Sequence, residues 1–150
     1  MGGISSRLDD TYLNHRILWD LDDCTYEQAI KSLSDVQQQY NLGCINIISD
    51  KNKSYGAVCN TIVSFKELLH ILIDTQFIDE IYVMYALRRM EAILRLSDKE
   101  GRLMHRDVIL KLYNKSDRLE NNEDFYILNY ETGFIKNGLK LMGKEVDNID

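Results

Sequence analysis

Two carboxylates in the segment 15–23 have the spacing of a metal site. The segment reads His-Arg-Ile-Leu-Trp-Asp-Leu-Asp-Asp, an apolar run that ends in acids, and we expect it to form a β-strand. Successive side chains of a strand point to opposite faces, so Asp20 and Asp22 would point the same way, about 6.5–7 Å apart. Such carboxylates repel each other unless a cation lies between them or one takes up a proton. The pair therefore predicts a site for Mg²⁺ or Mn²⁺, and the alternative is an acidic strand end that leads into a helix cap.

Helix and strand signals surround this segment. Thr25 and Ser64 each start a capping-box pattern, a hydroxyl residue followed three positions later by Gln or Glu, which marks the start of a helix. Two β-branched runs on either side of a polar turn predict a hairpin between these helices. We expect helices over 26–42, 65–73 and 79–89, and further strands over 44–49, 54–59 and 91–97. The inward residues would be Phe65, Leu68, Leu69, Leu72 and Ile73 in the second helix, and Tyr82, Tyr85 and Ala86 in the third.

The order strand, helix, strand, strand, helix, strand is typical of the ferredoxin-like, or RRM-like, βαββαβ sandwich. This α+β fold has an antiparallel sheet with helices on one face, and its first strand lies between the third and the fourth. One register would then place Asp20, Asp22, Tyr55 and Arg95 together on the open face of the sheet.

The chain of 150 residues has the size of one domain. We expect a flexible lead-in at 1–14, a palm-like core at 15–102, and a C-terminal extension at 103–150 that packs on the same domain. Within the extension, 108–113 fits a strand or a helix. No apolar run approaches the roughly 18 residues of a membrane span, and the three cysteines are widely spaced, so we expect a cytoplasmic protein without disulfides or membrane partner.

Positive charge is concentrated in one part of an acidic chain. The net charge is −6, yet the segment 88–111 contains seven basic and four acidic residues. A local basic face on an acidic protein is a candidate for binding phosphate, and the alternative is a solvated surface of mixed charge. The candidate phosphate-binding residues in this segment are Arg88, Arg89, Arg95, Lys99 and Arg102.

Three stretches within 17–102 resemble the catalytic palm of archaeo-eukaryotic primases and primase-polymerases, in the small versions that viruses and plasmids carry. The apolar strand that ends in Asp20-Leu-Asp22 is similar to the family's first motif, whose acids hold the metal ions for nucleotidyl transfer. The segment 49–58 falls where the family has a small-residue turn and a strand with a histidine that contacts the nucleotide triphosphate; this chain has Ser54-Tyr55-Gly56 there and no histidine. The segment 93–99 is similar to a late strand in which an arginine and a lysine approach phosphates.

This resemblance implies a primase-like palm protein in the DNA replication of a phage or plasmid. Asp20 and Asp22 would hold Mg²⁺ or Mn²⁺, and Arg95 and Lys99 would contact phosphates. Phosphoryl transfer uses cations that clamp the attacking and leaving oxygens, which paired carboxylates supply. The partners would be nucleotides with single-stranded or primer–template nucleic acid, or a replication protein. Whether such a palm acts as a nucleotidyltransferase or only binds its ligands stays open.

Three other functions fit parts of the sequence. The segment 53–58 partly matches the RNA-recognition consensus, in which aromatic side chains stack on bases, and Tyr55 would be the stacking residue of a non-catalytic RRM-like module. The run 20–25 is similar to the nucleophile motif of haloacid-dehalogenase-like phosphatases. The third is a non-catalytic protein-interaction module of a phage or plasmid.

Overall fold

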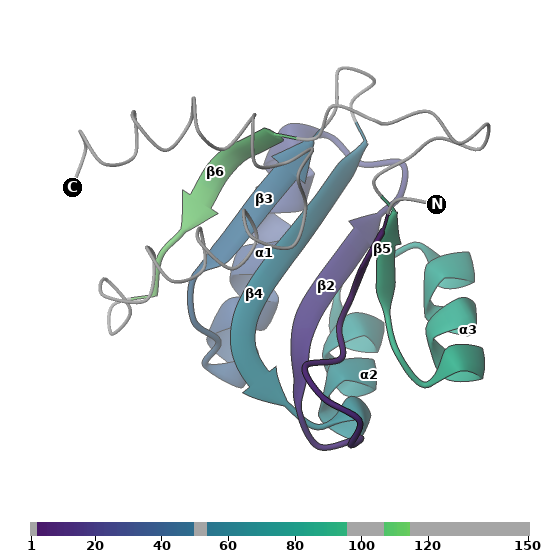
Figure 1. Cartoon of the computed structure of the whole chain (residues 1–150). Coiled ribbons are helices and arrows are strands. Elements are labelled where there is room, and N and C mark those ends of the chain that lie inside the picture. Colours follow the sequence, from purple (N-terminus) through teal and green to yellow (C-terminus); the bar gives the residue numbers. More distant parts are fainter. Residues whose placement is uncertain (1–2, 50–53, 96–106, 115–150) are drawn as a thin grey trace.

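The computed structural model describes residues 3–49, 54–95 and 107–114, which form an α+β fold with antiparallel sheets (Figure 1). The predictions for Lys99 and Arg102 lie outside these residues. No described helix is long and apolar enough to cross a membrane. The elements are β1 (Gly3–Ser5), β2 (His15–Leu21), α1 (Tyr26–Tyr40), β3 (Ile45–Ser49), β4 (Tyr55–Val63), α2 (Phe65–Asp74), α3 (Glu80–Arg89), β5 (Ile93–Arg95) and β6 (Asp107–Leu112).

The main sheet has the strand order β2-β4-β3-β6 with antiparallel neighbours. The predicted hairpin is confirmed, since β3 and β4 pair from Ile45 opposite Cys59 to Ser49 opposite Tyr55. Strand β2 pairs with the other edge of β4 and places Asp20 opposite Gly56. The segment 108–113, which fitted either a strand or a helix, lies largely in β6 next to β3.

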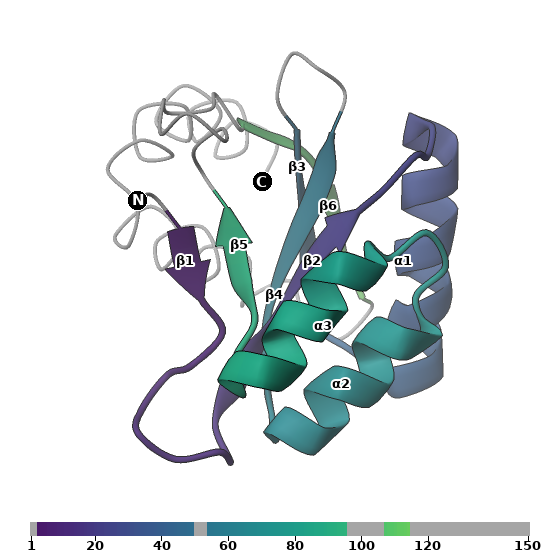
Figure 2. The ribbon, with the colours of Figure 1, turned by 90° about the vertical axis from the view of Figure 1, so that its right-hand side faces the viewer.

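The helices cover one face of this sheet (Figure 2). Alternation along β2 turns Ile17, Trp19 and Leu21 toward them, and all three side chains are buried. The Trp19 indole N–H donates to Thr75 Oγ1 at the end of α2 (2.9 Å), so the largest side chain of the core also satisfies its polar group. The core residues that the helices contribute include Ala29, Leu33 and Val36 from α1, and Phe65, Leu68, Ile71 and Leu72 from α2.

The predicted helix starts are confirmed. In both capping boxes the hydroxyl accepts a backbone N–H while the Gln or Glu side chain accepts the N–H of the cap residue, Thr25 in α1 and Ser64 in α2. Asp79 caps α3 by accepting the N–H groups of the second and third residues after it. The prediction that Tyr85 faces inward is wrong, because the buried side of α3 carries Tyr82, Val83 and Ala86, and Tyr85 beside it is 48% exposed.

Strand β5 does not flank β2 as the ferredoxin-like order requires; it pairs with β1 in a separate two-stranded sheet. The cause is α3, which follows α2 and reverses the chain, so that β5 points in the same direction as β2 (Figures 1 and 2). The segment after β1 forms backbone hydrogen bonds with the residue before β5 and with β2. Ser6 N–H donates to Ala92 O (2.8 Å), and Ser6 O accepts from Arg16 N–H (2.9 Å). Ser6 and Arg7 of the N-terminal segment therefore pair with the start of β2, on the edge where the fourth strand was predicted.

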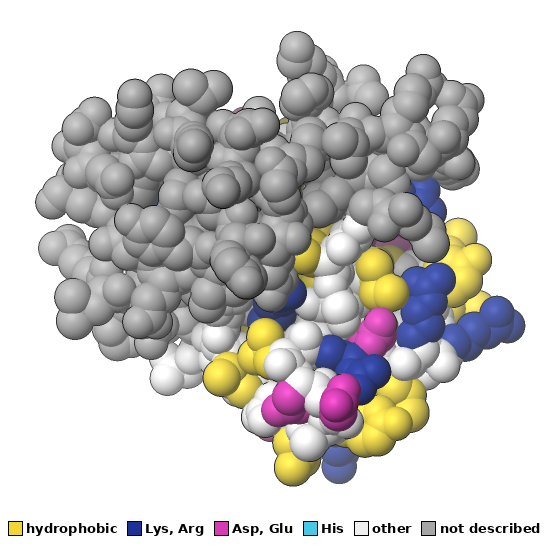
Figure 3. All heavy atoms as spheres, in the orientation of Figure 1, with side chains coloured by type: hydrophobic (Ala, Val, Ile, Leu, Met, Phe, Trp, Pro, Cys, Tyr) yellow, Lys and Arg dark blue, Asp and Glu magenta, His cyan; other side chains and the backbone are white. Residues whose placement is uncertain are grey.

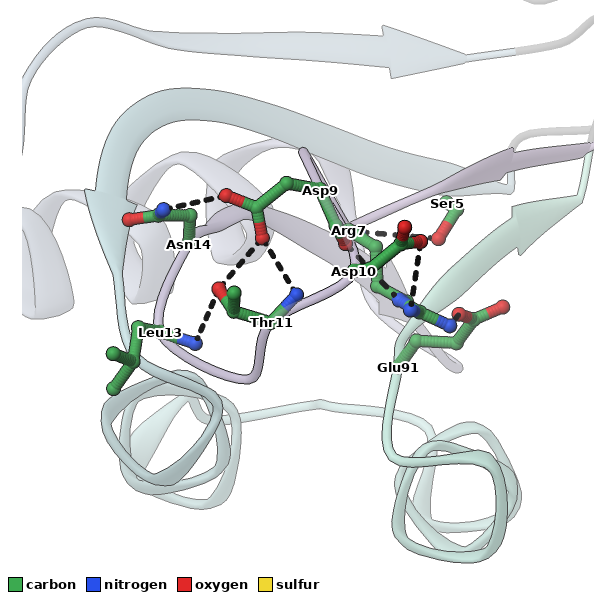
Figure 4. A network of polar contacts seen from close by, with 8 residues as sticks. All are labelled: Ser5, Arg7, Asp9, Asp10, Thr11, Leu13, Asn14 and Glu91. Carbon is green, nitrogen blue, oxygen red and sulfur yellow. Dashed lines mark hydrogen bonds and ion pairs between the residues drawn. The ribbon is translucent and has the colours of Figure 1, made fainter.

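The rest of the lead-in forms a loop tied by its own polar groups (Figure 4). The Asp9 carboxylate accepts the Thr11 N–H (2.8 Å), the Thr11 hydroxyl (2.6 Å) and the Asn14 amide (2.6 Å). These hydrogen bonds stabilise the charged carboxylate and lower the pKa of Asp9 to about 2. Arg7 also forms an ion pair with Glu91 (3.4 Å), which joins the loop to the segment before β5.

Candidate functional site

Four aspartates gather where β2 ends, and we call Asp20, Asp22, Asp23 and Asp79 the acidic corner. The loop between α2 and α3 runs beside the end of β2 as a short antiparallel bridge. Asp22 N–H donates to Phe77 O (2.8 Å), and Asp79 N–H donates to Asp20 O (2.9 Å). This bridge brings a carboxylate from a distant part of the chain to the predicted pair. Asp79 had no sequence signal for this role beyond being a helix cap.

Within the acidic corner, the surroundings of Asp22 disfavour its negative charge. The pKa of Asp22 is raised, first by partial removal of its carboxylate from water and then by the charges of Asp23 and Asp79. A raised pKa means that the ionised carboxylate is less stable here than in water. A bound cation would reverse that effect, because it would replace repulsion with attraction.

Asp20 lies on the face of the sheet that points away from the helices. Its opposite residue, Gly56, has no side chain, so the space above this pair is not filled from β4. The same face carries Asn46 of β3, opposite Lys111 of β6. Asn46 is 1% exposed, and neither of its amide atoms finds a hydrogen-bond partner in the described structure. An unpaired buried amide is costly, and Asn46 lies on this face beside the buried apolar side chains of Leu18, Val58 and Ile48.

Tyr55 is not on the face that carries Asp20, so the register expected from the sequence is wrong by one residue at this position. Tyr55 lies opposite Leu21 and therefore points toward the helices. Its ring packs 6.2 Å from the ring of Tyr26, and only 9% of the residue is exposed. The aromatic side chain expected to stack on bases is thus a core residue.

A pocket of about 460 Å³ opens beside the acidic corner at the N-terminus of α1. Its Cys24 thiol has a raised pKa because of burial and the nearby charges of Asp22 and Asp23, so the thiol stays neutral at pH 7. Thr25 and Gln28 on its wall bond to each other's backbone in the capping box. The pocket is lined by Leu21, Asp22, Asp23, Cys24, Thr25, Gln28, Ser54 and Tyr55. Asp22 and Asp23 give the pocket a negative charge, which favours the binding of a cation.

The basic candidates lie at two different ends of the fold. Arg95 is exposed at the C-terminal end of β5, and the ends of β2 and β5 lie at the same end of the molecule (Figure 1). Helix α3 starts at the acidic corner and extends away from it for about 15 Å, so Arg88 and Arg89 lie far from the aspartates. The structure therefore places Arg95 at the same end of the molecule as the end of β2, and it separates Arg88 and Arg89 from that end.

Among the described residues, no three Asp, Glu, His or Cys side chains are placed as a ready ligand set for a metal ion. A pair of carboxylates is enough for Mg²⁺, which proteins commonly hold through one or two carboxylates while water and substrate phosphate fill the other positions. Asp22, with Asp20 or Asp23, would be such ligands.

Comparisons with protein-family models, with curated proteins and with solved structures find no match for this chain.

Proposed function

We propose that this chain is a primase-like palm protein that binds a divalent cation at the acidic corner and, through that cation, the phosphates of a nucleotide or nucleic acid during replication of a phage or plasmid. The observation that carries the proposal is the position of Asp22. This carboxylate stands at the end of a buried strand, beside a pocket, and its pKa is raised first by partial removal from water and then by the charges of Asp23 and Asp79. Such a carboxylate is a favourable ligand for Mg²⁺ or Mn²⁺.

The charge of the corner makes phosphate binding depend on the metal. Phosphate would be repelled by Asp22 and Asp23, whereas a bound divalent cation would attract it. Arg95, at the same end of the sheet, would add attraction for phosphates further along a nucleic acid.

The proposal includes a ferredoxin-like origin of the palm. Strands β2 and β3 lie on either side of β4 and are joined by α1, as in the first half of that fold. The inserted β1 and the additional helix α3 would then be elaborations of the second half. The antiparallel pairing of the main sheet agrees poorly with a haloacid-dehalogenase-like phosphatase, whose sheet is parallel, so we prefer the palm.

Calorimetric titration of Mn²⁺ tests the metal site. The wild-type chain should bind Mn²⁺, and Asp22→Asn should weaken binding at least about tenfold because a charged ligand is lost. Asp35→Asn is the matched control, since Asp35 is an exposed aspartate on α1 that pairs only with Lys31 among the described residues, and it should bind as wild type. Negligible heats for the wild type, or equal binding by Asp22→Asn, would remove the metal from the proposal.

A second measurement separates binding from catalysis. A fluorescent nucleoside triphosphate should bind in the presence of Mn²⁺ and be released by a chelator, because phosphate cannot approach the unneutralised aspartates. Extension of a primer–template substrate would then assign nucleotidyl transfer. Metal-dependent nucleotide binding without extension would assign a palm that only binds, while nucleotide binding that ignores the chelator would contradict the role given to the acidic corner.

A further inference from the structure

Helix α3 presents an apolar surface to solvent, which we call the outer face of α3. Its large side chains are exposed although they are hydrophobic: Ile81, Met84, Tyr85 and Leu87. The opposite side of the helix already packs on the fold through Tyr82, Val83 and Ala86. Figure 3 shows hydrophobic side chains beside basic ones on the side of the molecule where α3 lies. Contiguous exposed apolar surface of this kind commonly marks a site of protein association.

The charges at the two ends of α3 are opposite in sign. Glu80 lies in the first turn and Arg88 in the last, about 12 Å apart along the axis. Neither side chain forms an ion pair within the described residues, so both charges are available to a partner. Arg89 is held differently, since its guanidinium lies over the ring of Tyr85, 5.1 Å from the centroid.

We propose that a second copy of this chain covers the outer face of α3, with the two helices antiparallel about a two-fold axis near Met84. A two-fold interface must be complementary to itself, because the same surface meets its own copy. Antiparallel packing satisfies this condition: Glu80 of each copy meets Arg88 of the other, and Ile81 and Met84 pack between the two ion pairs. A heterologous partner would need no such symmetric order of charges.

The size of the surface sets the strength of the dimer. A stable interface buries about 800 Å² on each partner, and a helix about 15 Å long offers less than this. Helix α2 packs beside α3 (Figure 2), and it also carries an exposed apolar residue, Ile73. We therefore expect a reversible dimer that forms at micromolar protein concentrations and dissociates on dilution.

Sedimentation velocity over a range of concentrations tests the dimer. The wild-type chain should shift from monomer to dimer as concentration rises, and Glu80→Arg or Arg88→Glu should each weaken association at least about tenfold, because each places like charges opposite each other twice. Glu27→Arg is the matched control, since Glu27 is an exposed acid in the first turn of α1, and it should associate as wild type.

Mixing the two charge-reversed variants makes the test specific for antiparallel pairing. The Glu80→Arg chain has a cation at both ends of α3, and the Arg88→Glu chain has a carboxylate at both ends. Each cation of one chain would therefore meet a carboxylate of the other, so two variants that are monomeric alone should associate when combined. Circular dichroism and thermal unfolding of each variant establish that it is folded. A wild-type chain that stays monomeric, single variants that still dimerise, or a mixture that fails to associate would each overturn the proposal.

Discussion

The hydroxyl of Ser6 and the imidazole of His15 form a buried hydrogen bond, with Ser6 Oγ 2.9 Å from His15 Nδ1. Ser6 Oγ also accepts the backbone N–H of Ala92 (2.9 Å), so we assign its proton to the bond with the imidazole. His15 then accepts at Nδ1 and is neutral. The bond joins the segment after β1 to the start of β2 and to the residue before β5, so it holds together the part of the fold that departs from the predicted topology.

Stability should fall as pH is lowered through the titration of His15. Burial lowers the pKa of His15 below 6.5, and the charge of Arg7 lowers it further, against smaller opposite effects of Glu91 and Asp9. The unfolded chain therefore takes up a proton at a higher pH than the folded chain. The stabilising contribution is fully present above the unfolded pKa and is lost as pH falls through the folded pKa.

Urea unfolding at about pH 7.5, 6.5 and 5.5 measures this dependence. His15→Gln should lower stability at every pH and flatten its decline between these values. His70→Gln is the control, because His70 is exposed on α2, and it should keep the wild-type slope. A His15→Gln variant with the same slope as wild type would show that other groups cause the decline.

Truncation of Leu68 should destabilise the fold by about 2–5 kcal/mol, as for other buried leucines. Leu68 is fully buried between α2 and the sheet, whereas Ile73 on the same helix is 63% exposed. Ile73→Ala should therefore change the free energy of unfolding by less than about 0.5 kcal/mol. Leu69 is partly buried and should lie between the two. Similar losses for Leu68→Ala and Ile73→Ala in urea unfolding would contradict the orientation of α2.

Single-stranded nucleic acid should bind weakly and with strong dependence on salt, through the basic segment that includes Arg95 and Lys99. The negative charge of the rest of the chain repels a polyanion, so binding must rely on local contacts that release counterions. Arg95→Ala combined with Lys99→Ala should weaken binding to all sequences alike and reduce the salt slope.

Fluorescence anisotropy with a labelled oligonucleotide at about 50 and 200 mM salt measures both effects. The matched double variant Lys31→Ala with Lys66→Ala removes two exposed cations from α1 and α2, and it should lose less affinity. If the wild type fails to bind at the lower salt concentration, or if both double variants bind equally, the protein-interaction function becomes the better explanation.

The sequence by itself determined the elements whose signals are local. The capping boxes at Thr25 and Ser64 and the hairpin of β3 and β4 were predicted, because each depends on residues a few positions apart. The apolar stripe of α2 was predicted less completely, since Ile71 is buried while Ile73 is not. Helical spacing restricts which residues share a side, but neighbouring elements decide how wide the buried side is.

Only the tertiary structure decided how distant segments meet. The pairing of β1 with β5, the face on which Tyr55 lies and the approach of Asp79 to Asp20 all join residues far apart in the sequence. A change of one residue in register moves a side chain to the other face of a sheet, and local propensity hardly distinguishes the two registers. The acidic corner arises in this way, because the backbone bonds between the end of β2 and the loop before α3 form only when α2 and α3 pack on the sheet.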